Sequence, residues 1–253
     1  MNTISLPLLN KLSAKLYHLI IFITLFATPM LFTSCDELLS SLEVELTEAE
    51  IAEGLKEALI VGANESVSQT NQTDGYYSNP LIMIPWPSEA QGAYDFIDNN
   101  LPVIKPLLNE VVLLMNRGAE NASEKATPIF VDAIMAMTIA DARNILFGDD
   151  NAATQYLYEK TYASLHTAFK PDIYESLETV GAATAWNSIT SYYNPLATFT
   201  PGINPINTDL ADYTTTMALD GLFLLIEEEE LKIRTDPVAR INDVLKKVFG
   251  ELD

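Results

Sequence analysis

Apolar residues recur at helical spacing through most of the chain beyond residue 47. In the first such stretch Ile51, Leu55 and Leu59 are four residues apart, which places them on one face of a helix. Thr47, followed three residues later by Glu50, has the spacing of a capping box. The pattern therefore predicts a helix that begins after Thr47 and ends in the polar stretch that follows.

The same combination of a start signal and an apolar stripe repeats along the chain. Ser88 with Gln91 marks one start, and Pro128 occupies the first turn of another helix, where its missing amide costs nothing. We therefore expect helices over residues 88–99, 172–180 and 238–249, and further helices through residues 107–122, 128–137, 138–147, 152–162, 186–193 and 210–230.

Three segments interrupt this pattern. The apolar residues from Leu81 to Ile84 are flanked by prolines, which is compatible with one short strand but not with a helix. Pro171 is expected to break a helix, and residues 194–208, which contain three prolines, are expected to be a connection rather than a lid. The prediction is an all-α fold, a single multi-helix domain of about eight to ten helices with at most a short strand near Leu81 to Ile84.

Two of these helices are expected to meet at Gly148. Thr138 with Asp141 marks the start of the first helix, and Gly148 is expected to end it in a left-handed conformation. Asp149 or Asp150 is then expected to cap the second helix.

Arg143 is a permanent cation among apolar neighbours on the first of these two helices. Asp141 lies two positions away, so the two side chains point about 200° apart around the helix. If the Arg143 face is buried, its partner must come from another helix, and Glu120, Asp132 and Asp220 are the candidates.

The first 34 residues have the features of a targeting segment. Residues 1–18 contain two lysines and no acid, and residues 19–32 are an apolar stretch broken only by two threonines and a proline. This stretch is short for a membrane span and suits a signal-peptide core. It ends in Leu-Phe-Thr-Ser before Cys35, the only cysteine, and this resembles the lipobox of bacterial lipoproteins, with Phe32 at the position usually held by leucine.

The lipobox resemblance implies that the Cys35 thiol is diacylated, with palmitate-type chains, and that the signal is removed before it. The expected organisation is a signal peptide over residues 1–34, a lipidated tether over residues 35–46 and a helical domain over residues 47–253. A plain secretory signal or a buried cysteine is the alternative. The implied location is the bacterial cell envelope, with the outer membrane favoured. Asp36 and Glu37 resemble an inner-membrane retention signal in one group of bacteria and a surface-export signal in another, so the membrane face stays open.

The net negative charge of the chain excludes some classes of binding partner. Lys and Arg number 14 against 35 Asp and Glu, a formal charge of −21. This field repels nucleic acid and anionic lipid headgroups, so the sequence predicts no nucleic-acid partner, and contact with a membrane through the lipid anchor only. A soluble acidic surface is the simplest reading of the charge.

The chain carries no signature of a catalytic, metal or cofactor site. His166 is the only histidine beyond the signal, so a zinc site would depend on carboxylates, and neither a nucleophile elbow nor a glycine-rich phosphate loop is present. We therefore expect no cofactor and no metal, and a surface or capping role for His166. The acidic run 227–230 is expected to be a solvated helix face, with Glu228–Lys232 and Glu230–Arg234 spaced as ion pairs.

A set of polar residues remains within the apolar motifs, on helices or at helix starts. In the functional interpretation they line a pocket in which Arg143 or Arg117 binds an anion and Glu120, Asp141 or Asp220 transfers protons. In the structural interpretation, which we favour, they are charged pairs and caps that fix the register of neighbouring helices. The set comprises Asn116, Arg117, Glu120, Asp132, Asp141, Arg143, Asn151, Thr154, Asp220, Arg234 and Arg240.

Five motifs, in order, resemble an uncharacterised bacterial family, a domain of unknown function (DUF, number 4197). They are LMNRGAE at 114–120, MTIADARNIL at 137–146, NAATQY at 151–156, ALDGLF at 218–223 and IRTDPVAR at 233–240. Gly118 stands where the family often has alanine, a change that keeps the residue small. The resemblance implies a helical, exported and often lipid-anchored protein with no established activity.

Three classes of function therefore stay open. We favour a non-catalytic envelope protein that binds a partner protein or acts as a scaffold. The alternatives are a carboxylate-based hydrolase and a carrier of an apolar ligand in a cavity between helices.

Overall fold

The computed structural model describes residues 47–240 and 242–252. The chain divides into two units, residues 1–45 and 46–253, and the second contains every described element. The predicted signal peptide and tether, with Cys35, lie outside the described residues. The structured part is entirely helical, which confirms the predicted all-α class, and no strand occurs in residues 47–240 or 242–252.

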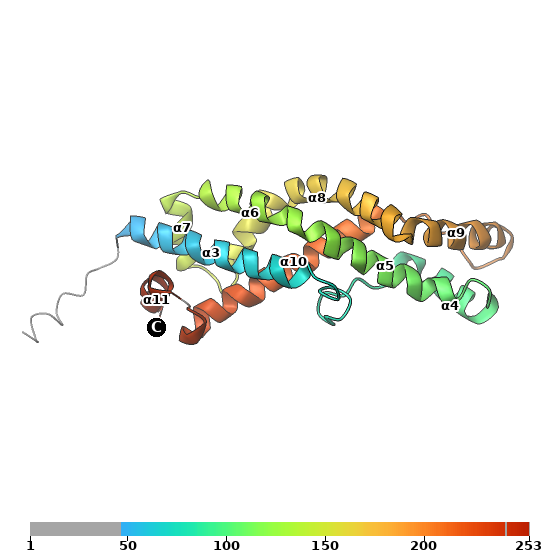
Figure 1. Cartoon of the computed structure of the whole chain (residues 1–253), viewed down its shortest axis with the longest axis horizontal. Coiled ribbons are helices and arrows are strands. Elements are labelled where there is room, and N and C mark those ends of the chain that lie inside the picture. Colours follow the sequence, from blue (N-terminus) through green and yellow to red (C-terminus); the bar gives the residue numbers. More distant parts are fainter. Residues whose placement is uncertain (1–46, 241, 253) are drawn as a thin grey trace, which may run out of the picture. The chain divides into compact units, whose positions relative to one another are not determined.

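Most of the α-helices follow one another with short connections, whereas longer segments join α3 to α4 (residues 71–90) and α9 to α10 (residues 200–209) (Figure 1). They are α3 (Glu48–Thr70), α4 (Gln91–Asn100), α5 (Pro106–Ala122), α6 (Ala126–Met135), α7 (Ile139–Leu146), α8 (Ala152–Val180), α9 (Ala182–Phe199), α10 (Leu210–Thr235) and α11 (Asp243–Phe249). Single 3-10 turns at Ser88–Ala90, Ser123–Lys125, Pro237–Ala239 and Gly250–Leu252 join or extend them.

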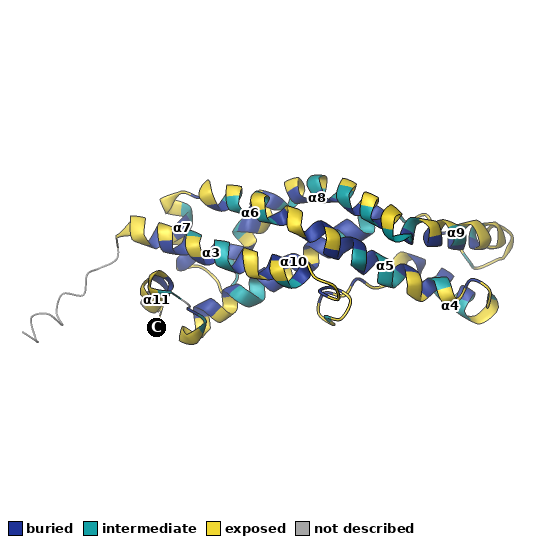
Figure 2. Ribbon diagram, viewed as in Figure 1, coloured by how far each residue is buried: buried dark blue, intermediate teal, exposed yellow. Residues whose placement is uncertain are grey.

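The long helices α8 and α10 pack against each other along the middle of this unit. Helix α5 packs on α8 and α9, and α3 contacts α6, α7, α10 and α11. The buried faces of all these helices point inward (Figure 2). Their core is one continuous cluster, whose largest fully buried side chains include Phe130, Phe169, Leu108, Met115 and Leu157.

Local start signals explain several boundaries. Thr47 and Glu50 form the predicted capping box at the start of α3, and Thr138 and Asp141 form the predicted one at the start of α7. In each box the threonine hydroxyl accepts from the backbone amide three residues later, while the acid accepts from the threonine amide.

Two predicted interruptions are wrong. Helix α8 continues through Pro171, and α9 continues through Pro195 to Phe199, so only the last part of segment 194–208 is a connection. In α8 the buried stripe Leu165, Phe169, Ile173 and Leu177 keeps its spacing of four across the proline. Continuous packing of this stripe offsets the hydrogen bond that a proline removes.

The region between Leu81 and Ile84 is also not a strand. The amides of Ile82 and Met83 both donate to the carbonyl of Asn79, which makes a turn. Ile82 and Ile84 are buried and Leu81 is exposed. The apolar run that suggested a strand is therefore a loop with two anchored side chains.

Gly148 does not adopt the predicted left-handed conformation, which occurs instead at Gly181 (φ 88°), between α8 and α9. Space explains the glycine at 148, because a Cβ there would lie 2.7 Å from the carbonyl oxygen of Asn144 and 2.9 Å from the Cβ of Ala152. The predicted caps Asp149 and Asp150 are not used either, since α8 begins after Asn151 with no cap from its own side chain.

Candidate functional site

Asn116 on α5 fastens the loop between α3 and α4. Its carboxamide oxygen accepts from the amide of Ile84 at 2.9 Å, and its nitrogen donates to the carbonyl of the same residue at 2.8 Å. The side chain is completely buried. Asn116 therefore supplies both hydrogen bonds that a neighbouring strand would supply to a residue in a sheet.

Arg117, the next residue of α5, and Glu120, one turn after Asn116, hold the same loop. Glu120 accepts from the amides of Tyr76 and Tyr77, and Arg117 bonds to Glu120 and to Asp74, both at 2.7 Å. These two carboxylates raise the pKa of Arg117.

Helix α10 completes the attachment of this loop. The hydroxyl of Tyr76 donates to the carbonyl of Ala218 at 2.8 Å, and a Cβ at Gly221 would lie 2.9 Å from the Cβ of Ile82. Burial raises the pKa of the Tyr76 phenol. The motifs at 114–120 and 218–223 thus hold one loop from two sides.

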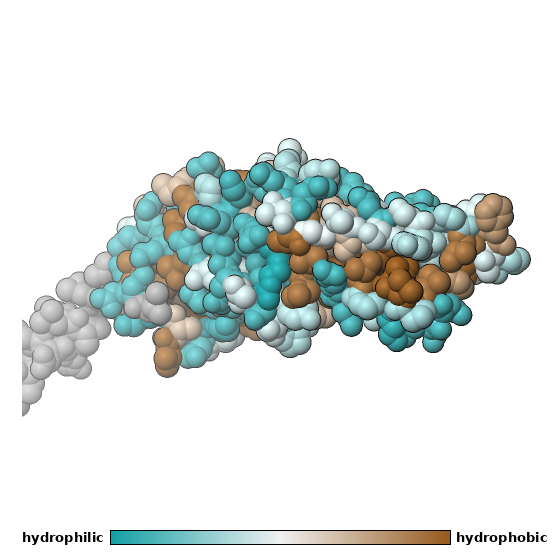
Figure 3. Space-filling model, turned by 45° about the vertical axis from the view of Figure 1, so that its right-hand side comes forward, coloured by the Kyte–Doolittle hydropathy of each residue, from teal (hydrophilic) through white to brown (hydrophobic). Residues whose placement is uncertain are grey.

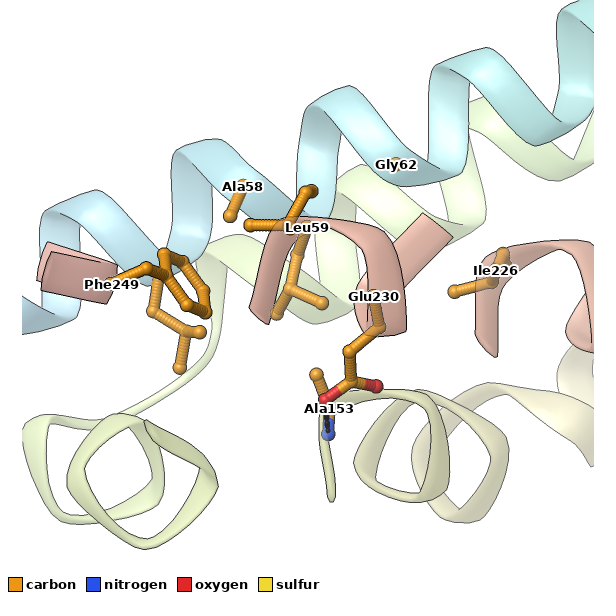
Figure 4. A pocket seen from close by; sticks show the side chains of 9 residues that line it. Ala58, Leu59, Gly62, Ala153, Ile226, Glu230 and Phe249 are labelled. Atoms are coloured by element: carbon orange, nitrogen blue, oxygen red, sulfur yellow. Dashed lines mark hydrogen bonds between the residues drawn. The ribbon is translucent and has the colours of Figure 1, made fainter. Parts of the chain in front are cut away.

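A second polar network lies where α7 ends and α8 begins. Glu230 reaches across from α10, and its carboxylate accepts from the amides of Ala153 (2.9 Å) and Thr154 (2.8 Å) and from the Thr154 hydroxyl (2.8 Å) (Figure 4). Its side chain is only 6% exposed. Glu230 thus caps the start of α8 from another helix and places a negative charge at its positive end.

Arg234, one turn after Glu230, places a positive charge at the C-terminal end of α7, the negative end of that helix. Its guanidinium pairs with Glu230 at 2.8 Å and donates to the carbonyls of Ile145 and Leu146, the last two residues of α7. Arg240 in turn donates to the carbonyls of Ile233 and Arg234 at the end of α10. Three helix ends are therefore joined by these side chains.

A small pocket lies beside this network, between α3, α10 and α11 (Figure 4). Its lining is apolar except for Glu230, and its free volume of about 20 Å³ is that of about one water molecule. Leu59, Ile226 and Phe249 are among the side chains around it.

An open groove runs along the other side of α10, against the start of α8. It consists of two hollows of about 660 and 270 Å³ that share Asn151 and Glu227. Acidic, neutral polar and apolar side chains share its lining, which comprises Gly148, Asp149, Asp150, Asn151, Thr154, Gln155, Tyr158, Asp220, Phe223, Leu224, Glu227 and Leu231.

The remaining predicted residues do not join one cluster. Asp141 is occupied by its capping box, Asp132 is exposed on α6, and Asp220 is exposed in the groove. Arg143, on α7, is 57% exposed and lies 3.5 Å from Glu48, so the expectation that it is a buried charge paired with Glu120, Asp132 or Asp220 is wrong.

His166 on α8 is half-buried, and its Nε2 lies 3.7 Å from a carboxylate oxygen of Asp212 on α10. Within residues 47–240 and 242–252, no group of three or more His, Cys, Asp or Glu side chains is arranged to hold a metal ion. No helix in this described part is long and apolar enough to cross a membrane.

The residue that the sequence interpretation missed is Glu230, which was expected on a solvated face. Its pairing with Arg234 was predicted correctly, whereas Lys232 pairs with Glu229 rather than with Glu228. The available signal was the apolar stripe of α10, since Ile226 and Ile233 lie on either side of Glu230 on the buried face.

Comparison with known proteins identifies the family. The profile of the family described as "Protein of unknown function (DUF4197)" matches residues 45–250. This range includes every described α-helix, and only the final 3-10 turn, Gly250–Leu252, extends beyond it. No curated protein and no solved structure matches the chain. The match covers most of the sequence, and the chain belongs to the DUF4197 family.

Proposed function

We propose that this chain is a lipid-anchored protein of the bacterial cell envelope whose helical domain binds a partner and does not catalyse a reaction. The observation that carries the non-catalytic part of this proposal is that the buried charges bond to helix ends and to a loop inside the domain. Glu120, Glu230 and Arg234 all do so. Because these contacts hold the domain together, they support a structural role for the buried charges rather than a reactive centre.

Exposed apolar side chains support a role in contact with other molecules. They gather over the end of the unit where α4, α5 and α9 lie (Figure 3). There Val103 is 84% and Phe199 is 87% exposed, with Tyr192 and Leu196 on the same face of α9 as Phe199. Contiguous apolar surface of this kind marks interaction sites in folded proteins.

The carrier alternative receives little support. A site for a small apolar ligand usually has a volume of several hundred Å³. The apolar pocket between α3, α10 and α11 holds about one water molecule.

One observation favours the hydrolase alternative. Apolar neighbours desolvate Asp220 and raise its pKa, and a perturbed carboxyl group in a groove is a candidate acid or base. Incubation with panels of ester, phosphate, glycoside and amide substrates tests this function. We expect no turnover, and turnover that Asp220→Asn abolishes would replace the proposed function with an enzyme.

The anchor is tested with the full-length chain and its Cys35→Ala variant expressed in a bacterium. We expect the wild type to carry acyl mass and to partition into detergent, and the variant to do neither. A wild type without acyl mass, or a variant that stays equally membrane-bound, contradicts the anchor.

A further inference from the structure

We propose that the groove between α10 and the start of α8 binds a basic, amphipathic segment of another protein, one that alternates lysine or arginine with apolar side chains. This inference rests on the binding role proposed above. It adds a binding site that is separate from the apolar surface over α4, α5 and α9, and it names the chemistry of the partner.

The α10 wall of the groove is a regular stripe. Asp220, Leu224, Glu227 and Leu231 are spaced four, three and four residues apart, which places them on one helix face. At a rise of 1.5 Å per residue the stripe is about 16 Å long. Its acidic and apolar members alternate along this length.

The opposite wall comes from the connection into α8 and from its first turns. Asp149 and Asp150 are exposed there, and Tyr158 is 43% exposed beside the apolar part of the groove. Leu224 and Leu231 are also partly open to solvent. The groove therefore presents both kinds of side chain; we call its apolar members, with Leu224 and Leu231, the floor and its four carboxylates the rim.

The rim carboxylates have no cation to neutralise them. Within the described residues, no lysine, arginine or histidine nitrogen lies within 4 Å of the carboxylates of Asp149, Asp150, Asp220 or Glu227. A cationic partner could form ion pairs with these four carboxylates, and the formal charge of −21 would steer it toward the protein.

Charge and shape together select the class of partner. An acidic or neutral segment would bring like charge or no charge to the rim, and a polar basic segment would leave the floor uncovered. A segment with basic side chains four to seven residues apart and apolar side chains between them meets both parts of the stripe. Asp220 also benefits, because a nearby cation favours the ionised carboxyl that its surroundings disfavour.

Fluorescence anisotropy of the full-length chain in detergent tests the proposal. The probe is a labelled peptide of about 14 residues with lysine and leucine in the spacing above, compared with a peptide that has glutamate for lysine and one that has serine for leucine. We expect binding of the first peptide only, weakened as salt rises.

The double variant Asp220→Asn, Glu227→Gln is expected to weaken this binding about tenfold or more, as loss of two charge contacts would. Its matched control is Glu175→Gln, Glu178→Gln, which removes the same charge from exposed sites on α8 and should leave binding unchanged. Leu224→Ser separately tests the floor and should also weaken binding. Melting curves confirm that each variant is folded.

Equal binding by the groove variant and its control overturns the proposal but leaves the anchored binding protein intact. Three other results would each overturn the proposal in favour of another occupant. Preference for the serine-containing peptide would indicate a polar basic segment. Calcium binding that the groove variant abolishes would indicate a cation, and a dimer that this variant dissociates would indicate a second copy of the chain. Loss of the acyl anchor, or turnover dependent on Asp220, would instead contradict the proposed function.

Discussion

The carboxylate of Glu230 serves at the start of α8 as an N-cap side chain serves at the start of α3 or α7. It accepts from two free amides there, while Arg234 donates to the free carbonyls at the end of α7. Both side chains are almost fully buried, so the pair is stable only while both charges and both helix ends are present.

Arg234→Met is therefore expected to lower the free energy of unfolding by about 3–5 kcal/mol, since it leaves Glu230 buried without its counter-charge. A domain has only about 5–15 kcal/mol in total, so urea unfolding will register this loss easily. The double variant Arg234→Met, Glu230→Gln should recover part of it.

Arg143→Met is the matched control for this prediction. Arg143 is 57% exposed, and its contact with Glu48 is a surface pair worth about 0–1 kcal/mol. A larger effect at Arg143 than at Arg234 would contradict the burial that separates the two arginines.

Asn116 and Asn194 form the same pair of bonds in different surroundings. Asn194 on α9 accepts from the amide of Ile206 and donates to its carbonyl, as Asn116 does with Ile84. Asn116→Ala leaves two buried backbone groups unpaired and should cost about 1–3 kcal/mol for each. Asn194 is half-buried, so water can replace its bonds, and Asn194→Ala should cost less in the same unfolding experiment. Equal losses would mean that burial does not decide the cost.

At the scale of elements, the short helix α11 packs on the first turns of α3. Gly54 faces α11, and a Cβ there would lie 2.3 Å from the Cγ2 atom of Val248. Leu245, Val248 and Phe249 are buried. The glycine therefore sets how closely the two helices approach.

Gly54→Ala should displace α11, and hydrogen exchange followed by mass spectrometry should show faster exchange in residues 243–249. Addition of Val248→Ala should restore slow exchange, because it removes the methyl group that the new Cβ meets. Gly62→Ala is the control on the same helix, where the nearest atom would be 3.7 Å away. There alanine should be neutral or stabilise by up to about 1 kcal/mol through helix propensity. Slow exchange of α11 in Gly54→Ala would contradict the close contact.

At the scale of the whole domain, the last helix is tied to the first. Lys247 on α11 donates to Glu50 on α3 at 2.9 Å, and Asn242 donates to Glu57 at 2.7 Å. The hydrogen bond from Lys247, followed by those from Thr47, lowers the pKa of Glu50 to about 2. The same carboxylate thus caps α3 and fastens the chain end.

This tie predicts a pH dependence. Because the folded-state pKa of Glu50 is depressed from 4.5 to about 2, its contribution to stability is present above pH 4.5 and is lost as the pH falls toward 2. Lys247→Met should therefore lower the melting temperature at pH 7 but not near pH 2. A difference between variant and wild type that is unchanged across this range would contradict the role of the ion pair.

Local signals allowed the sequence by itself to determine the helical class and many helix starts. A capping box such as Thr47 with Glu50 acts within four residues, and an apolar stripe acts within a few turns, so neither depends on distant parts of the chain. The sequence indicates only that Gly118 is small, and in the structure it faces Leu177, whose Cδ2 would lie 3.1 Å from an added Cβ.

The tertiary structure alone decided how the polar residues are used. Glu230 lies 76 residues from the helix start that it caps, and Asn116 lies 32 residues from the loop that it holds. Contacts between residues so far apart in the chain produce no pattern within a short stretch of sequence. Arg143 and Arg234 carry the same charge on helices, and only the packing of other helices exposes one and buries the other. The groove likewise exists because α10 and the start of α8 lie side by side, an arrangement set by long-range packing.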